Sequence, residues 1–123
     1  MTVGPVSQRT PARAEHIVTL GVLSMRSERD GDVHTITLSG EIDLSNAADV
    51  ERELMSVEAT DAGVILVDLS GLTFMDSTAI RLLVSACARS RAGSGRLALR
   101  RPSDGVGRVL RIAGIEHLLP FAD

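Results

Sequence analysis

The fold is decided by the stretch VILVDLSGLTFMDSTAIRLLVSAC, residues 64–87. It opens with the unbroken apolar run Val64–Val67, closed by Asp68-Leu69, and this pattern is typical of a strand buried on both faces. A short turn is expected at Ser70-Gly71, and a loop over 72–75 follows it. From Ala79 onward the apolar residues recur at i, i+3, i+4 and i+7, which predicts an amphipathic helix. Its predicted buried stripe is Ile80, Leu83, Val84 and Cys87.

Three oxygen-bearing side chains, Asp76, Ser77 and Thr78, lie where the predicted loop becomes the helix. Helix caps and anion sites both occur at such positions. Spacing alone therefore favours a simple reading, in which these residues only begin the helix.

The composition is that of one globular domain. The 123 residues are 44% hydrophobic and 24% charged, which is enough for a core and too apolar for a disordered chain. No apolar run approaches the roughly 20 residues that a membrane-spanning helix needs, and the N-terminus lacks a signal-peptide pattern, so we expect a cytoplasmic protein without membrane insertion. The single cysteine, Cys87, excludes an internal disulfide and a cysteine-based zinc site, and we expect it to be a core residue.

Charge is unevenly distributed along the chain. Acids dominate between Glu28 and Asp76, whereas Asp104 is the only acid between Arg81 and Arg111. A basic half can indicate nucleic-acid binding. The chain has two Phe and no Trp or Tyr, however, so the usual platforms for stacking bases are missing. We therefore expect no direct nucleic-acid binding and read these arginines as solvated surface residues.

The N-terminal half predicts a flexible arm and a β-hairpin. Residues 1–14 contain Pro, Gly and polar residues, and we expect them to form a loose arm before a domain over 15–123. The half-alternating segment 17–25 predicts one strand, with Gly21 as a bulge. Asp30-Gly31 supplies the positive φ of a hairpin turn. Beyond it, residues 33–38 alternate cleanly, and the predicted core face is His34, Ile36 and Leu38.

Three more elements precede an apolar tail over 115–121 that should pack on the sheet. They are a helix over 47–58 capped by Ser45 or Asn46, a strand over 96–100 and a helix over 104–113 capped by Ser103. Their predicted buried stripes are Ala47, Val50, Leu54 and Val57; Leu97 and Leu99; and Val106, Val109, Leu110 and Ala113.

This element order predicts an α/β fold, a small mixed sheet of four to five strands covered by three to four helices. The loops after Leu38, Leu69 and Arg100 should leave the sheet at one edge, where sites of open α/β sheets collect. We therefore expect Asp43, Asp76-Ser77-Thr78 and Arg101–Ser103 to lie close together.

The sequence shows no catalytic, metal or cofactor motif. Ser77 is not in a G-x-S-x-G elbow, and none of His16, His34 and His117 lies on the loops of that edge. A P-loop, a dinucleotide fingerprint and metal-ligand spacing are absent from the sequence. We therefore predict a protein that is not an enzyme and that carries no metal or cofactor.

Gly40-Glu41-Ile42-Asp43, Val64–Leu69 and Phe74–Thr78, taken together, resemble the bacterial anti-sigma factor antagonists, the STAS domain family. The resemblance runs from about Leu20 to Phe121 and implies a mixed sheet covered by helices. In that family the serine matching Ser77 is phosphorylated by a cognate anti-sigma factor that is a serine kinase. The unmodified antagonist binds this kinase and frees a sigma factor.

The resemblance implies that Ser77, with Thr78 as the alternative, is the phosphorylation site of a monomer or weak dimer. The implied partner-binding residues are Glu41, Asp43, Asp76, Ser77, Thr78 and Arg81. The family usually has Ser-Ser/Thr-Gly-Leu-Gly here, and this chain replaces both glycines, with Ala79 and Arg81. Ala79 is the better helix former by about 1 kcal/mol. Arg81 places a cation one turn from Ser77, where it either alters the choice of partner or pairs with a phosphate.

Two other functions stay open at this point. The chain could be a STAS subunit of a larger assembly, such as a lipid-transport complex, in which Ser77 and Thr78 are only caps and contacts. It could also be a small-ligand or nucleotide sensor that uses the loop 101–103 as an anion site.

Overall fold

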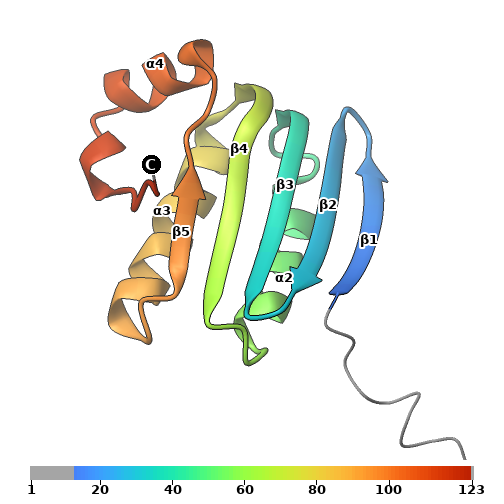
Figure 1. Cartoon of the computed structure of the whole chain (residues 1–123). Coiled ribbons are helices and arrows are strands. Elements are labelled where there is room, and N and C mark those ends of the chain that lie inside the picture. Colours follow the sequence, from blue (N-terminus) through green and yellow to red (C-terminus); the bar gives the residue numbers. More distant parts are fainter. Residues whose placement is uncertain (1–12, 123) are drawn as a thin grey trace, which may run out of the picture.

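The computed structural model describes residues 13–122, with the side chains from residue 15 onward. Five strands form one sheet in the order β1-β2-β3-β4-β5 (Figure 1). The strands are β1 (Arg13–Leu20), β2 (Leu23–Asp30), β3 (Val33–Ile42), β4 (Val64–Met75) and β5 (Leu97–Arg100). β1, β2 and β3 pair antiparallel, while β3, β4 and β5 pair parallel. The predicted mixed sheet of an α/β fold is confirmed.

The helices are α2 (Ala47–Glu58), α3 (Ser77–Ala92) and α4 (Asp104–Ile112), followed by a 3-10 turn, η1 (Glu116–Leu118). α2 and α3 lie together on one face of the sheet, and α4 lies beyond its β5 side (Figure 1). The predicted stripe of α2, the inward leucines of β5 and Cys87 are all buried. The tail returns to the sheet as predicted, since Phe121 forms a parallel bridge with Leu99.

Two predicted stripes are partly wrong. On α3 the buried residues are Ala79, Leu82, Leu83, Ala86 and Cys87, while Ile80 and Val84 are only half-buried. α3 packs on both the sheet and α2, so small alanines fit the close approach and the buried face is turned from the predicted one. On α4, Val106 and Leu110 are buried as predicted, but Val109 and Ala113 are exposed because no element covers that side of the helix.

The predicted single strand over 17–25 is instead a second hairpin. Gly21 has a φ of +64° and forms a tight turn with Val22, and Leu20 pairs with Leu23 across it. A glycine supplies the positive φ that such a turn needs. The turn was not predicted because apolar residues flank Gly21 on both sides and make the segment resemble one continuous strand. β1 begins at Arg13, inside the predicted arm, and the rest of that arm lies outside the described residues.

β4 is longer than predicted. The expected turn at Ser70-Gly71 and the expected loop over 72–75 are both part of the strand, which pairs with β3 as far as Ile42 and Met75. The register shifts twice, because β4 has one extra residue opposite Leu38 and another between the partners of Gly40 and Glu41. Such bulges let a strand bend without losing its partner. The predicted exit of β3 after Leu38 is therefore wrong by four residues.

Gly40 lies in this bulged region and pairs with Leu23, next to the turn of the β1–β2 hairpin. Its φ is +102°, and a Cβ at this position would lie 2.1 Å from the carbonyl oxygen of Val22. The next amide, that of Glu41, donates to the same carbonyl at 3.2 Å. The position therefore requires glycine both for its backbone conformation and for the space.

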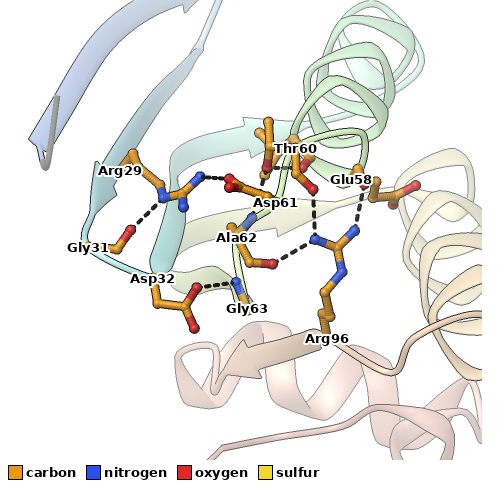
Figure 2. Close-up of polar contacts among 10 residues, drawn as sticks. Arg29, Gly31, Asp32, Glu58, Thr60, Asp61, Ala62, Gly63 and Arg96 are labelled. Carbon is orange, nitrogen blue, oxygen red and sulfur yellow. Dashed lines mark hydrogen bonds and ion pairs between the residues drawn. The ribbon is translucent and has the colours of Figure 1, made fainter. Parts of the chain in front are cut away.

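At the opposite end of the sheet, Arg96, which directly precedes β5, forms hydrogen bonds to the loop after α2 (Figure 2). Its guanidinium reaches the end of α2 and the loop after it, where a cation is favoured by the helix dipole. The acceptors are the carbonyl oxygens of Glu58 at 2.5 Å, Thr60 at 3.0 Å and Ala62 at 2.6 Å. Arg29, on β2, contacts Asp61 of the same loop at 3.2 Å. This loop is therefore held by Arg29 from β2 and by Arg96 from the position before β5.

A polar pair, Ser27 and His34, lies on the helix-covered face of the sheet. Ser27 Oγ is 2.6 Å from His34 Nε2, and His34 Nδ1 is buried without a hydrogen-bond partner among the described residues. Burial lowers the pKa of His34 below 6.5, Arg29 and His16 lower it further, and Glu53 opposes them.

We expect Gly40→Ala to cost about 2–4 kcal/mol of unfolding free energy, because left-handed strain and steric overlap add. Gly21→Ala is the matched control: its φ is also positive but nothing lies within 4 Å of the added Cβ, so it should cost only about 1 kcal/mol. Urea unfolding of both variants checks this. Equal losses would contradict the close contact with Val22.

We also expect the unfolding free energy to decrease as the pH falls below 6.5. The pKa of His34 is lower in the folded state than in the unfolded state, so the unfolded chain binds a proton more readily in that window. Urea unfolding at pH 7.5 and pH 5.5 measures the effect, and His34→Gln should reduce it. If His34→Gln shows the same pH dependence as the unmodified protein, the assignment to His34 is refuted.

Candidate functional site

The loop after β3 and the start of α3 are in direct contact. The amide of Leu44 donates to Asp76 Oδ2 at 2.9 Å, and the amide of Asp76 donates to the carbonyl oxygen of Ile42 at 3.3 Å. The expectation that Asp43 and Asp76-Ser77-Thr78 lie together is therefore confirmed. They are 33 positions apart in the sequence, and the extended β3–β4 pairing brings them together.

The loop that carries Asp43 is rigidly held. Asn46 is 2% exposed; its side chain accepts from the amide of Asp43 at 3.0 Å and donates to the carbonyl oxygen of Glu41 at 3.0 Å. Asn46 occupies the N-cap position of α2 but makes no capping bond, so the predicted side-chain cap is replaced by this loop clamp. The hydroxyl and amide of Ser45 donate to Asp43 Oδ1 and hold the pKa of Asp43 below its usual value. Asp43 thus presents a fixed, ionised carboxylate.

Asp76 is the residue that caps α3. Its Oδ1 accepts from the amide of Ala79 at 3.0 Å, and its Oδ2 is occupied by Leu44. Ser77 is the first residue of the helix; its side chain is exposed and makes no hydrogen bond to the residues that the structure describes. Thr78 is half-buried. Because Asp76 makes the capping bond, the Ser77 hydroxyl is not needed to begin the helix.

Arg81 lies one helical turn beyond Ser77 and is exposed. It lines a groove of about 250 Å³ between α2 and α3, together with Leu44, Ala47, Thr78 and Ser85. Within the described part of the chain, Arg81 has neither a hydrogen bond nor an ion pair. The groove therefore carries one available positive charge beside the Ser77 hydroxyl.

Sequence reasoning missed three exposed apolar residues around this site, which we call the apolar rim. They are Val22, Leu44 and Phe74, with exposed fractions of 60%, 76% and 47%. Val22 belongs to the turn that contacts Gly40, and Phe74 pairs in register with the exposed Glu41. An apolar patch edged by polar side chains is typical of a protein-binding surface. The only signal in the sequence was that Leu44 and Phe74 are apolar residues in segments that we expected to be loops, whereas Val22 was expected within a strand.

The expected third part of the site, Arg101–Ser103, contacts β4 and the C-terminal tail. β5 pairs with β4 only from Ile65 to Asp68, and Ser103 Oγ donates to the carbonyl oxygen of Leu72 at 3.3 Å. β4 continues from Leu72 for three more residues to Met75. β5 ends earlier, at Arg100, which pairs with Asp68. The guanidinium of Arg101 lies over the Phe121 ring, 4.4 Å from its centroid. The contacts of this loop are thus with β4, three residues before that strand ends, and with the C-terminal tail.

Neither a metal-binding group nor a membrane-spanning helix is found in the part of the chain that the structure describes. No three His, Cys, Asp or Glu side chains between residues 15 and 122 are placed to hold a metal ion. Of the helices in this part, none is long and apolar enough to cross a membrane.

We expect Asp76→Ala to lower the unfolding free energy by about 1–2 kcal/mol, because two amides lose their acceptor. Ser77→Ala should change it by less than about 0.5 kcal/mol, since this hydroxyl has no partner to lose. Urea unfolding of both variants tests the assignment of the cap. A loss in Ser77→Ala as large as that in Asp76→Ala would show that the serine begins the helix.

Comparison with known proteins points to one family. The STAS domain model matches residues 24–123. An anti-sigma-B factor antagonist of Listeria monocytogenes is 32% identical over 92 residues, which cover 75% of this chain and 81% of that protein. An anti-sigma-B factor antagonist of Staphylococcus aureus is 24% identical over 97 residues, which cover 79% of this chain and 90% of that protein.

Solved structures agree with the fold. The anti-sigma factor antagonist SpoIIAA in its unphosphorylated form gives a TM-score of 0.61 at 21% identity and covers 89% of both chains. An anti-sigma factor antagonist from Mycobacterium paratuberculosis gives 0.60 at 19% identity, covering 91% of this chain and 87% of its own. The sequence match and the shared fold together show that the chain belongs to the STAS domain family.

Proposed function

We propose that this chain, with residues 15–123 as its binding domain, is an anti-sigma factor antagonist. In this proposal it is a cytoplasmic, non-enzymatic monomer or weak dimer that binds a cognate anti-sigma factor of the serine-kinase type and so releases a sigma factor. Phosphorylation of Ser77 switches it off. The observation that carries the proposal is the exposed, uncommitted hydroxyl of Ser77, which Asp76 frees from any capping role.

The surface around Ser77 has the composition of a protein-binding site. The apolar rim supplies area that loses water on binding, and the charged side chains around it can set orientation and specificity. The proposed polar contacts are Glu41, Asp43, Asp76, Ser77, Thr78 and Arg81. The loop clamp of Asn46 keeps this surface in one conformation, which reduces the entropy lost on binding.

Phosphorylation would act on the partner-binding surface and not on the fold. A phosphate adds about 1.5–2 negative charges at neutral pH, and the first turn of a helix tolerates them because its amides and dipole are positive. The ionised Asp43 and Asp76 lie on the same surface and add to the negative field. A docked partner would meet this field and lose its contacts to the hydroxyl. A loss of about 3 kcal/mol weakens binding more than a hundredfold.

The test is capture of candidate anti-sigma factor kinases by two variants. Ser77→Asp should weaken binding at least about a hundredfold while its melting curve stays close to that of the unmodified protein. Ser77→Ala should still bind, and it should stay unmodified when incubated with the kinase and ATP, as read by mass spectrometry. Tight binding by Ser77→Asp would contradict the switch. Stable association without modification of Ser77 would instead favour a subunit of a larger assembly.

A further inference from the structure

Arg81 differs from most of the described arginines, because it has no partner among the residues that the structure describes. Of the arginines whose side chains the structure describes, all except Arg81 and Arg108 contact a carboxylate, a carbonyl oxygen, a hydroxyl or an aromatic ring. Arg81 is next to the proposed switch, whereas Arg108 is on α4. The free guanidinium therefore lies where an added negative charge would be placed.

The acids around Arg81 are already engaged. Both oxygens of Asp76 accept from backbone amides, and Asp43 Oδ1 accepts twice from Ser45. Glu51, which lines the same groove, is 3.5 Å from the guanidinium of Arg89. No acid lies in the first turn of α3. Arg81 contacts none of these acids within the described residues, so an anion added to this surface would meet a guanidinium that is not already paired.

Helix geometry favours contact between positions 77 and 81. Residues four apart lie on the same face of a helix, and helical side chains lean toward the N-terminus, so the guanidinium at 81 leans toward residue 77. An acidic group four residues before a basic one is the more stable order of such a pair. A phosphate and a guanidinium can also form two parallel hydrogen bonds.

We propose that Arg81 forms an ion pair within α3 with the phosphate of phosphorylated Ser77. This inference rests on the proposed function, in which Ser77 is the phosphorylation site. In the unmodified protein the Arg81 guanidinium is available to an acidic group of the partner. In the phosphorylated protein the phosphate takes it, so modification removes a positive contact as well as adding negative charge.

The test uses protein in which phosphoserine is installed at position 77 during translation, so that no kinase is required. Phosphorus NMR follows the second ionisation of the phosphate, which has a pKa of about 6 when unperturbed. We expect this pKa to lie about 0.5 lower in the phosphorylated protein than in the same protein carrying Arg81→Gln. Arg108→Gln removes the same net charge and, within the described residues, the other arginine without a partner, so this protein should titrate like the one that keeps both arginines.

Equal phosphate pKa values with and without Arg81 would overturn the ion pair. The ion pair would also be overturned if Arg108→Gln changed the phosphate pKa as much as Arg81→Gln does, because a long-range effect of net charge would then explain both changes. These outcomes leave the proposed function intact. Conversely, if cognate kinases fail to modify Ser77, the proposed function is contradicted while the titration still reports on Arg81. Melting curves of the three phosphorylated proteins confirm that each is folded during the titration.

Discussion

The parallel pairing of β3 with β4 is the constraint on which the rest of the structure depends. It runs from Val33 and Val64 to Ile42 and Met75, and two bulges on β4 absorb the extra residues without breaking it. Because both strands reach the same height, the loop after β3 meets the start of α3. A break at Ser70-Gly71 would have left Asp43 and Ser77 on separate, unsupported loops.

Where this loop meets α3, the side chains that hold the backbone differ from the side chains that are exposed to solvent. Asp76 and Asn46 make the bonds that hold the helix and the loop. Ser77 and Arg81 make none among the described residues, and they face the solvent. A surface built in this way can change its charge without changing its fold, because the groups that carry the charge are not the ones that hold the structure. Modification at such a site alters recognition alone.

The arginine-rich second half is largely built into the fold. Arg89 contacts Glu58 at 3.1 Å, Arg96 holds the loop after α2, and Arg100 contacts the buried carboxylate of Asp68 at 3.1 Å. Burial alone would raise the pKa of Asp68, but hydrogen bonds from Ser70 and Arg100 outweigh it and keep the pKa below its usual value. These three guanidiniums are engaged in contacts within the protein. Arg81, by contrast, is available on the surface.

From the residues alone one could predict the order of the elements from the turn at Gly31 onward, the bounds and stripe of α2, the inward leucines of β5 and the proximity of Asp43 to Asp76. Each of these follows from periodicity or turn chemistry within a few residues, or from the rule that parallel strands end at one edge. The continuation of β4 to Met75, the turn at Gly21, the apolar rim and the contact of Ser103 with Leu72 became visible only in the folded chain. Bulges, strand heights and exposure depend on which strand lies alongside, and that partner is not encoded in the local pattern of the residues concerned.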